Sequence, residues 1–580
     1  MTVIGMRKKQ YYHDYAEMTA LMESWEKESP LCSLSSIGTS QEGRELWLMT
    51  ITDSSTGSAD SKPAFWCEAN THAGEITGTE AALHLIDSLL TAYEEEDGSG
   101  PMTSLFKTST VYVLPRISVD GAELFLKTPF SVRSSPIMYP GWDDLPGLKP
   151  QDLTGDGEQL VMRIEDPAGG YKCAAEDPRI MVPREVDDYD EDETYYRLLP
   201  EGVFEDYDGE TQDGRPNNYD LNRQFPSGFK PGGPMNFSGG NPDEGPPGAG
   251  PYPLFLPEGQ YVMKAIAERN NIVSMLTYHT TGRILIQAAG GEMNSEDLSM
   301  FAELGAVGKK CTGYEPTSVS STPGPMTVDW AYYHRGILAW LPEIWSMQAE
   351  AGLGDEFDDE TQVNKSYYDL IGVMKFMESH LPEGTYFNDW EEFDHPQLGK
   401  LEIGGFKFKK TLQNPPETML EGEIKKLTSW AMKLAQALPR VTVKEASATP
   451  TGGGCSLVRV RLSNEGHLPT YGTLQSMTAN AVRKEALVKL TLTDGLAVIG
   501  GGGATTATAP HLMGRAVQRD HFLPFQASRY EGWTDHFNAH ETTVEWVVKG
   551  SGTVDVAVDF ERAGKLQVSI DVDGEAEAKL

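Results

Sequence analysis

KPAFWCEANTHAGEITGTEAALHLIDSLLTAYEEED, residues 62–97, reads as a strand, a loop and a helix in succession. Residues 62–70 form a short apolar run that ends at a polar loop, which is typical of a buried strand. Residues 77–97 predict a helix that Thr77 or Thr79 can cap. Its apolar side chains recur at near-helical spacing: Leu83, Ile86, Leu90 and Tyr93. A buried strand followed by a helix favours a sheet covered by helices.

The loop between them carries a histidine and a glutamate separated by two residues, His72 and Glu75. Both residue types bind zinc in proteins. With 12 His in 580 residues, about one such H-x-x-E match is expected by chance. A second copy, His380 and Glu383, stands at a predicted helix end with Pro382 inside it, so we expect it on the surface. The first copy leaves a buried strand, where open α/β sheets place their sites.

The same texture continues on both sides of this unit. Residues 11–29 look helical, and a hairpin turns at Ser40–Gly43. Further apolar runs predict buried strands, and periodic segments predict helices: strands at 110–117, 271–279 and 336–343, and helices at 367–381 and 421–439. We therefore predict an α/β domain with a mixed central sheet flanked by helices, within residues 1–440.

Two segments depart from that texture. Residues 134–216 are rich in Pro, Gly and acids, which indicates a long acidic insertion over one edge or mouth of the domain. From residue 441 to 580, strand-like runs alternate apolar and polar side chains between Gly-rich turns, which predicts an all-β sandwich domain. Inside the insertion, Asp152–Glu158 resembles a calcium loop, but Arg163 stands at its twelfth position. A plain acidic turn is the simpler interpretation, with Ca²⁺ as the alternative.

The overall composition excludes several classes of function. The formal charge is −38, from 86 acids and 48 bases, which disfavours nucleic-acid binding. No run approaches 18 apolar residues, so we expect no membrane span. No secretory signal is visible, and the five cysteines form no C-x-x-C pair. We therefore expect a cytoplasmic protein with free thiols, although a processed precursor could still be secreted. The sequence does not predict an oligomeric state.

Two polar residues end the later apolar strands. His279 closes the run at 271–279 and can supply a third metal ligand from another strand end. Glu343 closes the run at 336–343, where a carboxylate is costly unless it has a partner or a role. It is a candidate general base, and a buried salt bridge is the alternative.

The segment NYDLNRQF, residues 218–225, places Asp220, Asn222 and Arg223 together. Arginine is the natural bidentate partner of a carboxylate, and asparagine adds a donor. Alone, this segment is a loop with an Asx turn. Beside a zinc site, it would be a grip on a substrate carboxylate.

Taken in order, these motifs resemble the zinc carboxypeptidase family with the carboxypeptidase A-like fold. The matching features also include SVDGAE at 118–123, with Arg133 twelve residues after Gly121, IGTSQEGREL at 37–46, and the residues Val328–Trp330. The resemblance spans roughly residues 11–380, interrupted by the insertion. It implies one Zn²⁺ held by His72, Glu75 and His279, with Asp220 behind His72. It further implies Glu343 as the base, Arg133 at the oxyanion, and Asn222 and Arg223 on the terminal carboxylate of a peptide substrate.

The resemblance also exposes differences. Ser321 stands where many family members carry a lid tyrosine, and Tyr332 or Tyr333 could substitute. Gly74 stands where an arginine is frequent, so the next subsite outward is expected to lack a charge. Val328 holds the position that sets specificity. By the same alignment the terminal side chain meets only apolar residues, which predicts preference for apolar C-terminal residues: Val328, Met326, Ile286 and Leu341.

Two other functions fit the same residues. A zinc amidase or deacylase acting on a small molecule or a cell-wall peptide would use the same metal site. A catalytically inert zinc-binding protein, in which the sandwich recognises a partner, would retain the ligands without turnover. The Asn222 and Arg223 pair separates the first alternative, because only a substrate with a free C-terminus needs it.

Overall fold

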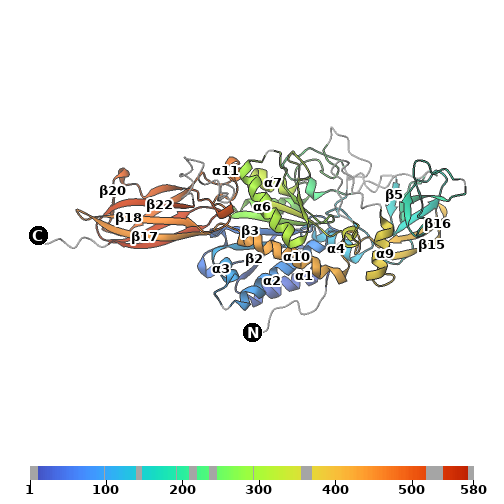
Figure 1. Ribbon diagram of the computed structural model, residues 1–580, viewed down its shortest axis with the longest axis horizontal. Helices are drawn as coiled ribbons and strands as arrows, with labels where there is room; N and C mark the ends of the chain where they lie inside the picture. Colours follow the sequence, from blue (N-terminus) through green and yellow to red (C-terminus); the bar gives the residue numbers. More distant parts are fainter. Residues whose placement is uncertain are drawn as a thin grey trace, which may run out of the picture.

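The computed structural model shows an elongated chain with a central body and a group of strands at each end (Figure 1). It describes residues 11–96, 98–138, 147–190, 192–207, 209, 218–233, 245–291, 293–353, 369–516 and 540–572. Parts of several predicted segments lie outside the described residues, namely 97 and 367–368 of two predicted helices, 139–146, 191, 208 and 210–216 of the insertion, and 517–539 and 573–580 of the sandwich. Figure 1 shows an α/β body in the middle, with β17, β18, β20 and β22 at one end and β5, β15 and β16 at the other.

The α/β body is built on an eight-stranded mixed sheet with the order β1-β2-β4-β3-β11-β14-β12-β13. Its strands are β1 (Cys32–Thr39), β2 (Glu45–Ile51), β3 (Ala64–Ala69), β4 (Thr110–Leu114), β11 (Ile272–Thr280), β12 (Ile284–Gln287), β13 (Glu315–Thr317) and β14 (Leu338–Ile344). The inner strands β4, β3, β11 and β14 run parallel, and the β1–β2 hairpin and β12 add antiparallel pairs. The predicted mixed central sheet is therefore confirmed.

Both faces of this sheet are covered, which explains its continuous apolar strands. All six residues of β3 are buried: Phe65 and Cys67 join the apolar cluster on one face, and Ala64 and Trp66 the cluster on the other. The first face is covered mainly by α1 (Tyr15–Glu28), α2 (Thr77–Glu95), α3 (Pro101–Thr108), α6 (Ser295–Thr312) and α10 (Glu417–Gln436). The second face is covered by α5 (Pro257–Ala267) and α7 (Thr327–Arg335). Shorter helices complete the body: α4 (Val119–Lys127), α8 (Met347–Glu350) and α9 (Leu370–His380).

The start of α2 differs from the sequence prediction. Neither Thr77 nor Thr79 caps the helix, because its N-cap is Ile76, which makes no side-chain cap. Instead the backbone N–H of Thr77 donates to Asn414 Oδ1, 3.1 Å away, from a segment 337 residues later. A tertiary contact thus satisfies the helix end, which local sequence could not reveal.

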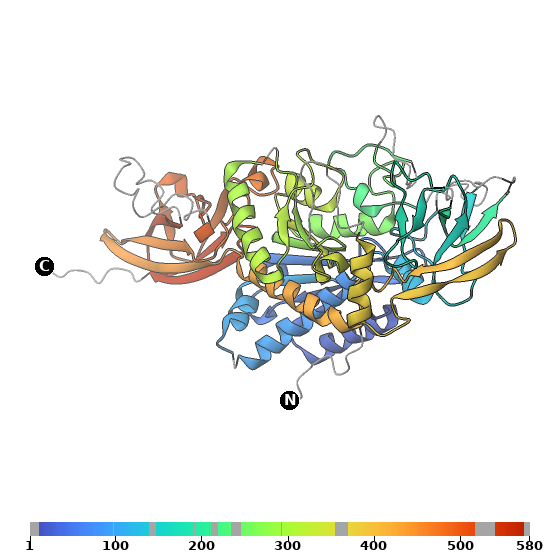
Figure 2. The same cartoon turned by 45° about the vertical axis from the view of Figure 1, so that its right-hand side comes forward.

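The predicted insertion does not merely cover the body but builds a sheet of its own. The insertion contains β5 (Gly147–Pro150), β6 (Val161–Glu165), β7 (Tyr171–Cys173), β8 (Met181–Pro183), β9 (Tyr195–Pro200) and β10 (Gly202–Glu205). Of these strands, β5 and β10 pair with each other as a separate two-stranded sheet. A hairpin from much later in the chain, β15 (Phe387–His395) and β16 (Gly399–Phe406), completes a six-stranded sheet in the order β15-β16-β6-β9-β7-β8. In Figure 2 this gold hairpin lies beside the teal strands of the insertion.

The described part of the C-terminal region consists mainly of β-strands, as the alternating pattern predicts. Two four-stranded antiparallel sheets, β17-β18-β22-β20 and β21-β19-β23-β24, share one apolar cluster between them. Their strands are β17 (Val441–Gly452), β18 (Cys455–Asn464), β19 (Glu485–Leu492), β20 (Ala497–Ile499), β21 (Thr506–Pro510), β22 (Glu541–Lys549), β23 (Gly552–Asp559) and β24 (Lys565–Val572), with α11 (Leu474–Thr478). Arg562, 1% exposed, donates to the carbonyls of Arg335 and Gly336 and so ties this region to the end of α7.

No helix among the described residues is both long and apolar enough to cross a bilayer. The five cysteines are free thiols.

Candidate metal centre and active site

Three neighbouring parallel strands bring the predicted site residues to one edge of the sheet. The strands β3, β11 and β14 are adjacent, so their carboxyl ends meet at that edge. His279 in β11 lies directly opposite Glu343 in β14. The loop that leaves β3 carries His72 and Glu75. Residues more than 200 positions apart therefore share one site because of strand order alone.

The three predicted ligands face each other at hydrogen-bonding distances. His72 Nδ1 lies 2.8 Å from Glu75 Oε1, and His279 Nδ1 lies 2.9 Å from Glu75 Oε2. The two Nδ1 atoms are 3.1 Å apart. All three residues are at most 3% exposed, and their ligand atoms lie within 4.8 Å of one another. Two imidazoles and one carboxylate that converge on a common point form the donor set of a catalytic zinc site with an open fourth position.

The loop that holds His72 owes its shape to Asn70. This residue adopts a left-handed conformation, with φ of 59°, which asparagine tolerates better than most residues. Its side-chain amide donates to the carbonyls of His72, 2.6 Å away, and Ala73, 3.1 Å away. The N–H of Ala73 in turn donates to the carbonyl of Arg133, 2.8 Å away. The ligand loop is thus fixed from within and tied to the segment that carries Arg133.

Asp220 connects the metal ligands to the cationic side of the site. Its Oδ1 lies 3.0 Å from His72 Nε2, and its Oδ2 accepts from Arg133 Nε, also at 3.0 Å. Arg133 Nη1 donates to Glu75 Oε1, 3.2 Å away. Because Asp220 engages Nε2, the Nδ1 atom of His72 carries the lone pair that faces Glu75 and His279, as a metal ligand requires.

The electrostatics of this cluster fit a bound divalent cation. Burial is the largest influence on the pKa of Glu75 and would raise it, but His72 and His279 outweigh burial and hold that pKa far below its usual range. Burial lowers the pKa of the His279 imidazole, which favours the neutral ring that can bind a metal. Buried Nε2 of His279 has no hydrogen-bond partner among the described residues. Two buried imidazole nitrogens at 3.1 Å need a shared cation, or a proton in its place, between them and the carboxylate.

Glu343 faces the cluster from the next strand and is only partly buried. Desolvation and the Glu75 carboxylate raise the pKa of Glu343 to about 8, against the opposing effects of His72, Arg133 and Arg223. A nearby divalent cation favours the ionised form of such a carboxyl. Glu343 is therefore suited to accept a proton once a cation is bound.

The NYDLNRQF segment lies against the same site. Residues Leu221–Arg223 form a short 3₁₀ helix, and Asp220 Oδ1 accepts from the N–H of Asn222 at 2.8 Å. Asn222 Oδ1 accepts from the N–H of Thr327 at the start of α7, 2.9 Å away. Arg223 Nη1 donates to the carbonyl of Asn222 at 2.9 Å. Since its oxygen is engaged, the amide NH₂ of Asn222 remains as a donor beside the Arg223 guanidinium.

The SVDGAE segment at 118–123 explains why Arg133 reaches this position. A Cβ atom on Gly121 would lie 2.0 Å from the carbonyl oxygen of Ser134, so only glycine lets the chain pass so closely after Arg133. Asp120 is buried and accepts from Ser40 Oγ and Arg44 Nη1, each at 2.7 Å. Two motifs that are distant in sequence therefore support each other.

Residues 18–137, which include His72, Glu75 and Arg133, match a family model described as zinc carboxypeptidase. This part of the chain is similar to the zinc carboxypeptidase family. The match to this family model does not reach His279 or Glu343. These two residues lie beside the loop of His72 and Glu75 because of the strand order in the sheet. Residues 440–571, the two C-terminal sheets, match a domain of unknown function (DUF8731).

Individual relatives cover small parts of the chain. It is 32% identical over 117 residues to carboxypeptidase M of Mus musculus, which is 20% of this chain and 26% of that protein. It is 30% identical over 115 residues to carboxypeptidase D of Mus musculus, 20% of this chain and 8% of that protein. The chain thus spans about a quarter or less of the length of these curated relatives. A solved structure of thrombin activatable fibrinolysis inhibitor shares 15% identity at a TM-score of 0.40, over 75% of this chain and 76% of that chain.

The predicted specificity residues lie together in one apolar cluster. Val328, Ile286 and Leu341 are buried, at 0%, 6% and 2% exposed, and Met326 packs against them. These residues expose little surface, and their contact with a substrate stays a prediction. The two candidate lid tyrosines are held inside the fold: Tyr332 donates to Asp297 Oδ2 at 2.8 Å and Tyr333 to the carbonyl of Ala289 at 2.5 Å.

The sequence prediction missed a segment that contacts and supports the loop of His72 and Glu75. Asn414, fully buried, donates to the carbonyl of Gly74 at 2.8 Å and accepts from Thr77 Oγ1 at 2.8 Å. Lys409 Nζ donates to three carbonyls ahead of Arg133: those of Phe125, Thr128 and Phe130. Gln413 occupies the space beside Gly74, where a Cβ atom would lie 2.7 Å from Gln413 Nε2. No local signal marks these residues, because only the tertiary fold brings them to the loop.

We expect Asn414→Ala to weaken metal binding, because the carbonyl of Gly74 and the hydroxyl of Thr77 lose a buried partner next to Glu75. Affinity for zinc should fall about tenfold, which is the lower end of the range for mutations of residues that hold metal ligands in place. Asn271→Ala is the control: Asn271 is also buried and donates to two carbonyls, but it precedes β11 at the opposite edge of the sheet. Chelator competition measures both variants, and equal zinc affinity in the two would contradict a positioning role for Asn414.

Two weaker sequence motifs lie away from the centre. In the Asp152–Glu158 loop, Asp152 accepts from the N–H groups of Gly155 and Gly157, at 2.6 and 3.0 Å, which is the pattern of an acidic turn. Calcium binding there stays a prediction. His380 ends α9, is exposed and stacks on Phe376, as expected for a surface copy of H-x-x-E.

Proposed function

We propose that this protein is a zinc-dependent metallocarboxypeptidase, which hydrolyses the last peptide bond of peptides that end in a free carboxylate. The observation that carries the proposal is that the ligand atoms of His72, Glu75 and His279 lie within 4.8 Å of one another, at the edge of the sheet where Glu343 stands near the end of β14. The family match over residues 18–137 supports it independently.

Zinc bound by these three residues would supply Lewis acidity, which polarises the peptide carbonyl and lowers the pKa of water towards about 7. Glu343 would take a proton from the attacking water and pass it to the nitrogen of the departing amine. Arg133 would donate to the oxygen of the attacked carbonyl as negative charge develops on it. Asp220 would keep His72 in the tautomer that leaves Nδ1 free, because it holds Nε2 at 3.0 Å.

Asn222 and Arg223 would bind the terminal carboxylate of the peptide. The amide NH₂ of Asn222 and the guanidinium of Arg223 are donors in one short helix, anchored through Asp220 and Thr327. An internal peptide bond offers no carboxylate at this position. The pair would therefore restrict hydrolysis to the last bond, and it separates a carboxypeptidase from an amidase with the same metal ligands.

We expect Arg223→Ala to lower kcat/KM by about 100-fold for peptides with a free C-terminus, which corresponds to about 2.7 kcal/mol of transition-state binding. Hydrolysis of the same peptides with an amidated C-terminus should remain slow and unchanged. Release of the terminal residue is measured by chromatography for both peptide sets.

Arg269→Ala provides the matched control for Arg223→Ala. Arg269 is also half-buried and donates to a backbone carbonyl, but it lies at the end of α5, away from the site. Its removal should leave both rates unchanged. An equal loss on free and amidated peptides in Arg223→Ala would favour an amidase, and zinc retention without any hydrolysis by the unaltered protein would favour an inert zinc-binding protein.

The terminal side chain that this enzyme prefers would be apolar. Val328 takes the specificity position and lies in one apolar cluster with Ile286 and Leu341. An arginine or lysine side chain would find no carboxylate among these residues to pair its charge. Hippuryl-Phe should therefore be hydrolysed at least about tenfold faster than hippuryl-Arg. Equal or inverted kcat/KM values would refute the proposed pocket.

A further inference from the structure

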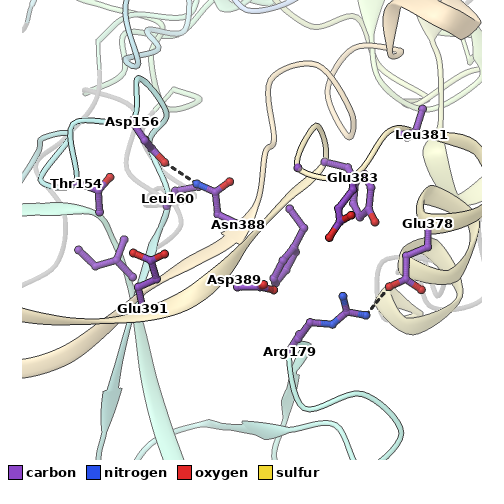
Figure 3. Close-up of a pocket in the computed structure, with 14 residues that line it drawn as sticks. Thr154, Asp156, Leu160, Arg179, Glu378, Leu381, Glu383, Asn388, Asp389 and Glu391 are labelled. Carbon is purple, nitrogen blue, oxygen red and sulfur yellow. Dashed lines mark hydrogen bonds and ion pairs between the residues drawn. The ribbon is translucent and has the colours of Figure 1, made fainter.

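A second pocket lies in the outer sheet, away from the metal ligands. It occupies about 710 Å³ between the β15–β16 hairpin, the end of α9 and the Asp152–Glu158 loop, and none of its lining residues belongs to the site described above. Figure 3 shows carboxylates arranged around it: Asp156, Glu378, Glu383, Asp389 and Glu391. The family match ends at residue 137 and so does not reach it.

The charge of this pocket is strongly negative. Among the described residues that line it, Arg179 is the single cationic one, and it already pairs with Asp177 at 2.7 Å and Glu378 at 2.6 Å. No ion pair joins Glu383, Asp389 or Glu391 to a cation in the part of the chain that the structure describes. Three carboxylates therefore face the pocket without a positive partner.

Four buried apolar residues also line the pocket, which distinguishes it from an ordinary acidic surface. Leu160, Leu381, Phe387 and Ile403 line it, and they are only 2–7% exposed. A long cationic side chain, which buries its apolar stem and keeps its charge near carboxylates, complements this combination.

Tyr386 adds a polar hydroxyl to the lining of the pocket. It lines the pocket and is 7% exposed, yet its hydroxyl makes no hydrogen bond to any residue that the structure describes. The charged groups that act on this hydroxyl, Glu378, Arg179, Glu383 and Asp389, all line the pocket. The ring is buried while the hydroxyl is open to the pocket, where it can donate to or accept from a group that enters.

The arrangement does not suit a metal ion. Ligands of a hard cation must approach one point closely, and among the described residues only His72, Glu75 and His279 converge in this way. The carboxylates of the outer pocket are spread around a volume instead. We propose that this pocket binds arginine or lysine side chains of a polypeptide segment.

The test uses the full chain and an acetylated, amidated peptide of alternating Arg and Ala, with a counterpart in which citrulline replaces each Arg. Calorimetry should show the Arg peptide binding at least about tenfold more tightly than the citrulline peptide. The double variant Glu383→Gln/Glu391→Gln should weaken binding of the Arg peptide by about tenfold.

The control variant is Glu94→Gln/Glu95→Gln, which removes the same charge from the exposed end of α2. This control should change the affinity for the Arg peptide less than about twofold, because removal of two distant charges is a small change in a net charge of −38. The proposal is overturned if the two double variants weaken binding equally or if the citrulline peptide binds as tightly. Calcium binding that is lost in the pocket variant would also overturn it, in favour of a metal site.

A second measurement identifies the source of the basic segment, and this one rests on the proposed peptidase function. If the segment belongs to substrates, the pocket variant lowers kcat/KM for long peptides with upstream Arg residues and leaves hippuryl-Phe unchanged. If it belongs to a separate protein, both rates stay unchanged while peptide binding is lost. Because binding is measured without hydrolysis, failure of the pocket and failure of the peptidase proposal give different results.

Discussion

Glu343→Gln should keep one zinc per chain and lose turnover by about 10³-fold, within the range for loss of a general base. Glutamine has the same shape and can occupy the same place at the end of β14, opposite His279. It cannot accept the proton that hydrolysis releases from water. Metal analysis and release of the C-terminal residue, measured on one preparation, test both halves of this expectation.

The control for that experiment is Glu68→Gln. Glu68 is a fully buried glutamate of β3 whose pKa burial raises to about 7, with Trp66 Nε1 as donor at 2.7 Å. Because the protonated acid resembles glutamine, this variant should keep its activity within a few-fold. Full activity in Glu343→Gln would refute the assignment of the base, whereas loss of zinc in that variant would make Glu343 a ligand instead.

The site could be predicted from sequence because its residues stand at the ends of strongly apolar strands. His279 and Glu343 each close a run that can only be a buried strand, so their polar side chains had to emerge at the edge of the sheet. The order of β3, β11 and β14 within the sheet is not visible in such runs. The family resemblance implied that His279 and Glu343 belong to one site, and their observed pairing across β11 and β14 agrees with it.

The outer sheet could not be predicted because its pattern is that of surface strands. β15 alternates buried and exposed positions poorly and carries the charged sequence FNDWEEFDH. Its hairpin partner β16 pairs on the other side with β6, more than 200 residues earlier, so the hairpin gives no local sign of the larger sheet. The contact of Asn414 with the loop of His72 and Glu75 could not be predicted for the same reason. Contacts between distant loops leave no periodic signal in a single sequence.

Removal of the metal should abolish hydrolysis and lower thermal stability. Without a cation, the Nδ1 atoms of His72 and His279 face each other at 3.1 Å beside a buried carboxylate, an arrangement that is costly unless a proton replaces the ion. A ligand that binds only the folded chain stabilises it by about 4 kcal/mol at a free concentration 1,000 times its Kd. Zinc added to chelator-treated protein should therefore restore activity and raise the thermal midpoint by several degrees, while magnesium should do neither.

His279→Ala should make this loss permanent. One of three protein ligands is then missing, so added zinc should restore neither activity, which falls by more than about 10³-fold, nor the thermal midpoint. His395→Ala is the matched control: His395 is 2% exposed and bonds the carbonyl of Gly202 at 2.8 Å, but it lies in the outer sheet. That variant should bind one zinc per chain and respond to it as the unaltered protein does. Equal zinc content in the two histidine variants would place the metal elsewhere and remove the foundation of the proposed peptidase.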